Sequence, residues 1–213
     1  MIKEYNKCFG TFSQSNGQTD TEYNIEVIGK EIYLKLQGSR STEDWIQNFN
    51  FFVELRFHFF KGRLIKPFKT FFFTHRGIYE KWLSIKESVH KQIDPLLKQD
   101  YQLYIHGFSQ GGGLTQIAHE DFYYYLLENK LDTDKVISWA FASPMVFGWL
   151  SSKVFKSRFK NLNVVRNVND IVPKLPGWLF GFRHYGKVIK IGRWKLTFPW
   201  QWLREHLSYK EKL

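Results

Sequence analysis

Apolar and polar positions alternate in two neighbouring stretches near the start of this chain, residues 23–28 and 31–36. Such alternation is typical of half-buried strands, and Gly29 between the two stretches predicts a hairpin turn. From Gly77 onward the apolar spacing changes to three and four residues, which predicts a long amphipathic helix that ends near Pro95. The apolar positions of this helix are Ile78, Trp82, Ile85, Val89 and Ile93.

Compact apolar runs later in the chain predict three further strands, at residues 103–106, 135–141 and 161–167. We expect one helix to begin at Gln110 and another to lie within residues 147–159. This order of elements places a helix after each of the first two of these strands.

The last part of the chain predicts a second hairpin. Residues 187–191 and 194–198 flank a Gly-Arg pair in the manner of two strands and a turn, and a short helix follows. Strands that alternate with helices predict an α/β fold, with a mainly parallel central sheet covered by helices on both faces. A length of 213 residues suits one domain, and no repeat or linker divides it. We therefore predict one α/β domain over residues 1–213.

Charge narrows the possible partners only partly. The chain carries 31 basic and 20 acidic side chains, a net charge of +11. This excess favours an anionic partner such as a lipid surface or nucleic acid, although it also serves solubility. The sequence contains no zinc spacing, helix-turn-helix pattern or aromatic RNA-binding motif, so we expect no specific nucleic-acid partner. It carries no signal for an oligomeric state.

Cysteine usage and hydropathy bear on the compartment. Cys8 is the only cysteine, which excludes an intrachain disulfide. The N-terminus is charged where a signal peptide needs an apolar stretch, and no run approaches the ~20 apolar residues that span a bilayer. We therefore expect a cytoplasmic protein, with export by another route left open.

No metal is expected, because His119 and Glu120 lack the second histidine of a His-Glu-x-x-His motif. Nothing in the sequence implies an organic cofactor.

Residues 107–111 form a Gly-x-Ser-x-Gly element between a predicted strand and a predicted helix. A serine hydroxyl becomes a useful nucleophile when it projects from such a tight turn toward a base, with backbone N–H groups beside it. The two glycines supply the missing side chains that a crowded turn requires. We interpret Ser109 as a nucleophile; the alternative is a glycine-rich turn with a surface serine.

A nucleophilic serine in this architecture is followed along the chain by an acid and then by a histidine. Asp170 follows the strand that ends at Asn167, where loops leave the carboxyl edge of the sheet and ligands bind. His184 and His206 are the histidines downstream of Asp170. His206 is favoured as the base because His184 immediately precedes a strand, where packing or hydrogen bonding explains it. Five histidines precede Asp170 and are interpreted as surface or hydrogen-bonded groups: His58, His75, His90, His106 and His119.

Several further segments, taken in order, resemble the class 3 (triacylglycerol) lipase family of the α/β-hydrolase superfamily. The resemblance covers most of residues 30–210, and the segments that carry it are Leu-Gln-Gly-Ser-Arg-Ser at 36–41 with Asp-Trp at 44–45, Thr-His-Arg-Gly-Ile-Tyr at 74–79, Phe-Ala-Ser-Pro-Met-Val at 141–146, Asn-Asp-Ile-Val-Pro-Lys-Leu-Pro at 169–176 and Arg-His-Tyr-Gly-Lys-Val at 183–188. The chain departs from the family pattern at Phe108, where histidine is usual, and at Gln37 and Met145, where arginine is usual. The elbow itself is also similar to that of acyl-protein thioesterases and small carboxylesterases.

The resemblance implies a role for each site residue. Ser109 is the nucleophile, Asp170 the orienting acid and His206 the base, while Ser39 and Gln110 supply the N–H groups of the oxyanion hole. A donor aimed at the developing charge can lower the barrier by about 3 kcal/mol, and one donor normally belongs to the residue after the nucleophile.

In class 3 lipases the lid over the active site falls between the segments that correspond to Trp45 and Thr74. We therefore hypothesise a lid or acyl-binding segment within residues 46–73, in which Phe51 and Phe52, together with Phe108, contact the acyl chain. Packing of these side chains in the core is the alternative. The basic and aromatic residues 56–69 would then suit contact with an anionic phospholipid surface.

Together these inferences predict a serine carboxylic-ester hydrolase that acts on lipid esters, as a lipase or phospholipase does, through an acyl-enzyme intermediate. The alternatives are an acyl-thioesterase or small-ester carboxylesterase, a peptidase with the same triad, and an inactive hydrolase fold that binds lipid or another anionic partner.

Overall fold

The computed structural model describes residues 1–16, 21–37, 74–148, 157–177, 179, 181–196, 198 and 201–213. The hypothesised lid within residues 46–73 lies outside these ranges, and so do Ser39, Phe51 and Phe52. Ser109, Gln110, Asp170 and His206 all lie within them.

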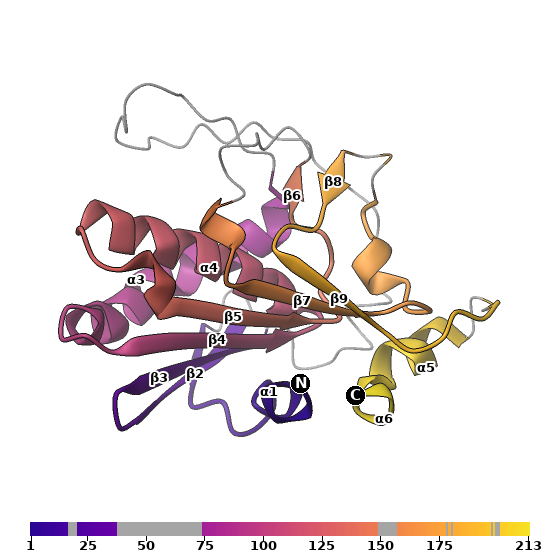
Figure 1. Ribbon diagram of the computed structural model, residues 1–213, viewed down its shortest axis with the longest axis horizontal. Coiled ribbons are helices and arrows are strands. Elements are labelled where there is room, and N and C mark those ends of the chain that lie inside the picture. The colour runs from indigo at the N-terminus through magenta and orange to yellow at the C-terminus, as the bar shows by residue number, and fades with distance from the viewer. Residues whose placement is uncertain are drawn as a thin grey trace.

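A seven-stranded sheet forms the centre of the described chain (Figure 1), in the order β1-β2-β3-β4-β5-β7-β9. The strands are β1 (Gln14–Asn16), β2 (Thr21–Ile28), β3 (Glu31–Gln37), β4 (Gln102–Phe108), β5 (Val136–Phe141), β7 (Leu162–Asn167) and β9 (Lys187–Ile191). Strands β3, β4, β5, β7 and β9 are parallel to one another, whereas β1, β2 and β3 pair antiparallel. A separate two-stranded ribbon joins β6 (Phe147–Gly148) to β8 (Phe182–Arg183).

The predicted hairpin and the predicted amphipathic helix are confirmed. Strands β2 and β3 pair across the turn at Gly29, from Ile28 opposite Glu31 to Glu22 opposite Gln37. Helix α3 (Arg76–Leu97) buries all five of the apolar side chains that predicted it. It ends two residues after Pro95, so the expected end was close to the observed one.

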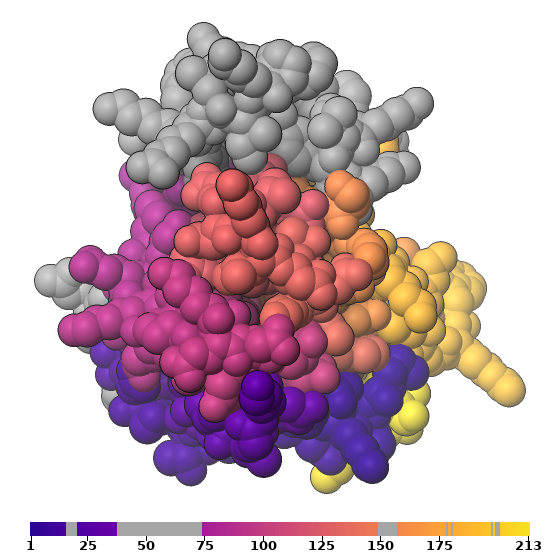
Figure 2. All heavy atoms as spheres, turned by 60° about the vertical axis from the view of Figure 1, so that its left-hand side comes forward, coloured from indigo at the N-terminus to yellow at the C-terminus, as the bar shows by residue number. Residues whose placement is uncertain are grey.

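Helices cover both faces of the sheet (Figure 1). Helices α3 and α4 (Gln110–Glu128) lie on one face, where a buried cluster includes Trp82 and Phe122. On the opposite face lie α1 (Ile2–Asn6), α5 (Trp202–Leu207) and α6 (Tyr209–Lys212). A second buried cluster on that face includes Tyr5, Phe141 and Tyr209. In the space-filling view, the magenta to salmon residues, among which α3 and α4 fall, lie above the indigo N-terminal residues (Figure 2).

Single turns of 3-10 helix occur at η1 (Thr133–Lys135), η3 (Ser157–Phe159) and η4 (Val172–Lys174). Among the described residues, no helix is long and apolar enough to cross a bilayer.

The helix predicted within residues 147–159 does not include the first two residues of that range. Phe147 and Gly148 form strand β6 instead, because Phe147 pairs with Arg183 and forms a bridge to Thr74. Only the turn η3 is helical at the other end, and residues 149–156 lie outside the described ranges. A short apolar run does not distinguish a strand from a helix, which explains the error.

The second predicted hairpin does not form. Strand β9 pairs in parallel with β7, and the described residues after Gly192 are in no strand. The carboxamide of Asn169 replaces a partner strand: its Nδ2 donates to the carbonyl oxygen of Arg193 at 2.8 Å, and its Oδ1 accepts from the N–H of Lys195 at 2.9 Å. These bonds hold the chain in place after β9 and satisfy backbone groups that a hairpin would have paired.

Candidate active site

Ser109 occupies the turn between β4 and α4. Its backbone has φ 56° and ψ −120°, a conformation that residues other than glycine rarely adopt. The N–H of Ser109 donates to the carbonyl oxygen of Phe141 at 2.9 Å, which ties the turn to the end of β5. The strand, strained serine and helix follow one another as a nucleophile elbow requires.

The glycines on either side of Ser109 are required by close backbone contacts. A Cβ atom on Gly107 would lie 2.2 Å from the carbonyl oxygen of Gly111, and one on Gly111 would lie 2.1 Å from that of Leu36. These neighbours are backbone atoms and cannot rotate away. The first turn of α4 therefore packs directly against the ends of β3 and β4.

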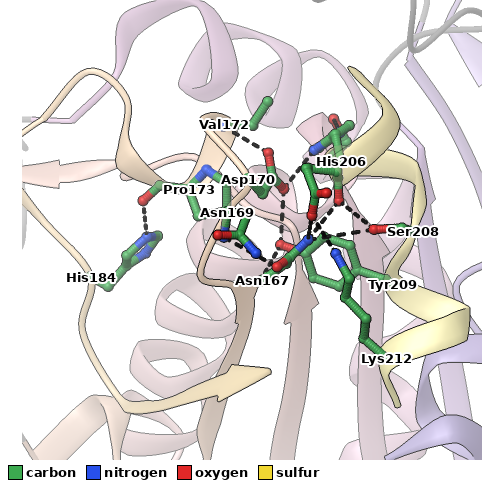
Figure 3. Close-up of polar contacts among 12 residues, drawn as sticks. Asn167, Asn169, Asp170, Val172, Pro173, His184, His206, Ser208, Tyr209 and Lys212 are labelled. Carbon is green, nitrogen blue, oxygen red and sulfur yellow. Dashed lines mark hydrogen bonds and ion pairs between the residues drawn. The ribbon is translucent and has the colours of Figure 1, made fainter. Parts of the chain in front are cut away.

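The three residues predicted as a triad form one chain of polar contacts. His206 Nε2 lies 2.9 Å from Ser109 Oγ, and His206 Nδ1 lies 2.8 Å from Asp170 Oδ2. Asp170 and His206 are fully buried, and Ser109 is 4% exposed. Asp170 follows β7 and His206 lies in α5, so the fold brings together groups that are far apart in the sequence. Figure 3 shows the Asp170 carboxylate directed toward the His206 ring.

Tyr209 is a member of this site that the sequence analysis missed. Its hydroxyl donates to Asp170 Oδ2 at 2.9 Å and accepts from the N–H of Asn167 at 2.8 Å (Figure 3). The other carboxylate oxygen, Oδ1, accepts from the N–H of Val172 at 2.9 Å. Burial, reinforced by the charge of Asp170, raises the pKa of Tyr209 well above its ordinary value, so the hydroxyl remains a donor. The only signal in the sequence is a spacing of three residues from His206.

Glu205 is a second residue that the sequence analysis missed. Its buried carboxylate forms ion pairs with Lys195 at 2.5 Å and with Lys212, and it accepts from Asn167 Nδ2 at 3.1 Å. Burial alone would raise the pKa of Glu205, but these three donors outweigh it and lower the pKa to about 2. Glu205 thereby ties α5, which carries His206, to the end of β7, to the segment after β9 and to α6.

His184 does not take part in the polar chain. Its Nε2 lies 2.7 Å from the carbonyl oxygen of Pro173, and Figure 3 places its ring apart from the Asp170–His206 pair. Burial lowers the pKa of His184 to about 4, so its ring is neutral near pH 7. This agrees with the hydrogen-bonding role expected for it.

The four described histidines upstream of Asp170 each contact a polar group other than Ser109. The contacts are His75 Nδ1 with the N–H of Ile78, His90 with Asp94 and Asp121, His106 with Glu4, and His119 with Ser138 and the carbonyl oxygen of Arg158. Their expected role as hydrogen-bonded groups is confirmed, and His58 lies outside the described ranges.

Gln110, predicted to line the oxyanion hole, is the first residue of α4. The first N–H groups of a helix have no intrahelical acceptor, so this position suits a donor to an oxyanion. Its side-chain Oε1 accepts from Lys81 Nζ at 3.0 Å. The second predicted donor, Ser39, lies outside the described ranges, but β3 ends at Gln37 with Leu36 paired to Gly107 beside the elbow.

Phe108 was predicted to contact substrate. Its half-buried ring packs against the ring of His206, with centroids 5.1 Å apart, and against Tyr5, Phe9 and Tyr209. These contacts place Phe108 beside the imidazole, and its contact with substrate stays a prediction. Phe51 and Phe52 lie outside the described ranges. In the part of the chain that the structure describes, no three His, Cys, Asp or Glu side chains are arranged to hold a metal ion.

The sequence model of the family described as Lipase (class 3) matches residues 33–180, more than half of the chain. The chain belongs to the class 3 lipase family. The matched range contains Ser109 and Asp170, and it ends before His206. The predicted α/β-hydrolase fold is also confirmed by solved structures of lipases.

Three of those structures illustrate the similarity of this class 3 lipase family member to known folds. A Rhizomucor miehei lipase in its propeptide complex has a TM-score of 0.69 and 23% identity, over 84% of this chain and 55% of that one. A triacylglycerol lipase from Penicillium expansum has a TM-score of 0.66 and 22% identity, over 89% and 74%. A triacylglycerol lipase whose catalytic centre is a serine protease triad has a TM-score of 0.65 and 21% identity, over 84% and 65%. The chain thus spans about half the length of the Rhizomucor lipase.

Proposed function

We propose that this protein is a serine hydrolase of carboxylic esters and that its substrates are lipid esters. One observation carries the proposal: a strained serine at a nucleophile elbow lies 2.9 Å from a buried histidine, which lies 2.8 Å from a buried aspartate. A surface serine in a glycine-rich turn would not need this arrangement. Family membership and the α/β-hydrolase fold support the same reaction class.

In the first half of the reaction, Ser109 Oγ attacks the ester carbonyl carbon while its proton moves to His206 Nε2. The carboxylate of Asp170 stabilises the imidazolium and keeps Nε2 directed at the serine. The tetrahedral intermediate then collapses, the bond to the alcohol oxygen breaks, and His206 gives its proton to that oxygen. The alcohol leaves, and the acyl group stays on Ser109.

In the second half, water attacks the acyl carbonyl carbon and gives a proton to His206. Collapse of the second intermediate returns that proton to Ser109 Oγ and releases the carboxylic acid. In both halves the oxyanion forms next to the start of α4. The N–H of Gln110 is the proposed donor there, together with that of Ser39.

The choice of lipid esters rests on family membership and on the similar solved structures. These structures include triacylglycerol lipases, one of them with a serine protease triad as its catalytic centre. Ser109 is 4% exposed, so its hydroxyl lies at the bottom of the site and not on an open surface. A lid or acyl-binding segment within residues 46–73 is part of this proposal, with Phe51 and Phe52 against the acyl chain.

A fluorophosphonate tests the reactive serine directly. Wild-type protein should gain the mass of one adduct, Ser109→Ala should gain none, and His206→Ala should react far more slowly. Ser88→Ala is a matched control, because it removes a hydroxyl bonded to Tyr23 in another part of the fold. Labelling that persists in Ser109→Ala would contradict the assignment. Absence of labelling on folded wild-type protein, with and without detergent micelles, would contradict hydrolase activity.

A substrate panel tests the chemical class. Triacylglycerols, phospholipids, short soluble esters and acyl thioesters should be compared with the same wild-type and Ser109→Ala proteins. Faster turnover of long-chain esters above their aggregation point is the expected result. A preference for thioesters or for short soluble esters, with no effect of aggregation, would contradict a lipid substrate.

A further inference from the structure

Large apolar side chains are exposed in the segment that follows β9. Trp194 is 76% exposed and Leu196 is 72% exposed, and Phe198 and Trp202 further along are 48% and 36% exposed. In both overall views this amber segment extends outward from the rest of the described chain (Figures 1 and 2). Scattered exposed apolar residues are ordinary, but tryptophan and leucine at these exposures in one short segment form a patch that water solvates poorly.

The same segment is strongly basic. Residues 187–204 contain five basic residues and no acidic ones, and they also contain three of the eight tryptophans of the chain. Arg193 and Arg204 are both exposed. Aromatic side chains combined with lysine and arginine fit the boundary of an anionic bilayer, where the rings sit among the headgroups and the cations meet lipid phosphates and carboxylates.

The exposed side chains are held in place by contacts on their neighbours. Asn169 binds the backbone on both sides of Trp194, through the carbonyl oxygen of Arg193 and the N–H of Lys195. The Lys195 ammonium turns toward the buried carboxylate of Glu205 at 2.5 Å. Trp194 and Leu196, on either side of Lys195, are both largely exposed and are therefore directed toward solvent.

These anchors connect the segment to the triad. Asn169 immediately precedes Asp170, and Glu205 immediately precedes His206. We propose that Trp194 and Leu196, flanked by Arg193 and Arg204, form a docking surface for anionic phospholipid membranes beside the active site. The inference rests on the proposed function, because it names the surface from which this enzyme would draw its lipid ester.

Flotation with lipid vesicles tests the docking surface without any need for hydrolysis. The parent protein carries Ser109→Ala, so that vesicles stay intact during the measurement. It should bind vesicles of phosphatidylcholine and phosphatidylserine in equal parts more tightly than vesicles of phosphatidylcholine alone. Added salt should weaken this binding, since it screens charges at the membrane surface.

Paired variants locate the surface. Trp194→Ser with Leu196→Ser should weaken binding to the mixed vesicles about tenfold or more. Arg193→Gln and Arg204→Gln should each weaken it about fivefold, as expected for one positive charge near an anionic membrane. The matched control is Val27→Ser with Ile28→Ser, which removes side chains that are 48% and 62% exposed at the β2–β3 turn. This control should bind as the parent does, and circular dichroism should find all variants folded.

Several outcomes would overturn the proposal. One is a Trp194→Ser, Leu196→Ser variant that binds vesicles as tightly as the parent. Another is a parent protein that does not bind vesicles but binds single-stranded DNA. A third is a parent protein that self-associates through Trp194 and Leu196. The enzymatic proposal is tested separately, by hydrolysis of a soluble ester with protein that retains Ser109. Vesicle binding that depends on Trp194 and Leu196, in a protein that hydrolyses no ester, would leave the docking surface standing and remove the enzymatic proposal.

Discussion

The hydroxyl of Tyr209 donates a hydrogen bond to Oδ2 of Asp170, the same oxygen that lies 2.8 Å from Nδ1 of His206. Tyr209 and His206 are three residues apart across the break between α5 and α6. One short C-terminal segment therefore supplies both the proposed base, His206, and a hydroxyl that holds the carboxylate of Asp170. The hydroxyl of Tyr209 bonds to Asp170 and to Asn167, and it acts on Ser109 only through Asp170 and His206, so we regard Tyr209 as a positioning residue.

Tyr209→Phe keeps the ring and removes the hydroxyl. We expect kcat/KM for a soluble ester to fall about tenfold, because Asp170 loses a donor that fixes its carboxylate. The free energy of unfolding should fall by about 1–3 kcal/mol, because the buried N–H of Asn167 loses its acceptor. Steady-state kinetics and urea unfolding measure the two effects separately.

Tyr23→Phe is the matched control for that variant. Tyr23 is also buried, and its hydroxyl lies 2.7 Å from Ser88 Oγ between β2 and α3. The control should lose some stability while kcat/KM stays at the wild-type value. Equal losses of activity in the two variants would mean that Tyr209 acts on the fold as a whole and not on Asp170.

The residues of the proposed triad could be predicted from sequence because their positions follow from chain order and from the ends of elements. Ser109 lies between strand β4 and helix α4, and Asp170 follows the parallel strand β7. His206 was favoured because His184 had a simpler explanation beside a strand, and the contact of His184 with Pro173 agrees with it. These inferences needed only local patterns and the known order of a triad.

The supporting residues could not be predicted in the same way. Tyr209 and Glu205 act through contacts with Asp170, Asn167 and Lys195, which depend on where the two short C-terminal helices pack. No local pattern encodes this packing. The second hairpin was predicted wrongly for a related reason, since the side chain of Asn169 bonds the backbone where the sequence pattern predicted a strand.

Gly107 and Gly111, two residues before and two residues after Ser109, should not tolerate a side chain. Gly111→Ala places a Cβ 2.1 Å from the Leu36 carbonyl oxygen, so the backbone must shift, and we expect a loss of about 3 kcal/mol or an insoluble protein. Gly77→Ala is the contrasting substitution within α3, where the nearest atom would be 3.7 Å away. It should stabilise the protein by about 0.5–1 kcal/mol, because alanine favours a helix more than glycine does. Thermal unfolding of both variants measures the difference, and equal effects would contradict the argument from packing.

His90 should make stability depend on pH above neutrality. Burial alone would lower the pKa of His90, but contacts with Asp121 and Asp94 outweigh burial and raise it to about 9. The stabilisation from protonated His90 is therefore complete below the unfolded pKa of about 6.5 and is lost as the pH rises through about 9. It amounts to at most about 3 kcal/mol, from the size of the pKa shift.

Urea unfolding of wild-type protein and His90→Gln across this pH range measures the effect. The difference in unfolding free energy should be largest near neutral pH and should shrink toward about pH 10. His119→Gln is the control, since burial lowers the pKa of His119 to about 4 and its ring is neutral throughout this range. Its difference from wild type should stay constant, and a constant difference for His90→Gln as well would contradict the predicted ionisation.

Glu205→Gln tests whether the anchor of α5 matters for catalysis. Burial alone would raise the pKa of Glu205. Hydrogen bonds from Lys195, Lys212 and Asn167 outweigh burial and lower this pKa to about 2. Its stabilisation is therefore present above the ordinary pKa of about 4.5 and is lost as the pH falls through about 2. At pH 7 we expect the variant to lose about 1–3 kcal/mol of unfolding free energy, since the amide no longer pairs with two ammonium groups.

Activity should fall further than this loss of stability explains. With the ion pairs gone, α5 is held less firmly against β7, and His206 spends less time within reach of Ser109, so kcat should drop while KM changes little. The control is Glu26→Gln, which removes a surface ion pair with Lys35 in the hairpin and should cost under about 1 kcal/mol with no change in kcat. A Glu205→Gln protein with wild-type kcat and reduced stability would assign Glu205 to the fold alone. A fall in kcat at a temperature where the variant is fully folded would instead identify the Glu205 contacts as part of what positions the base.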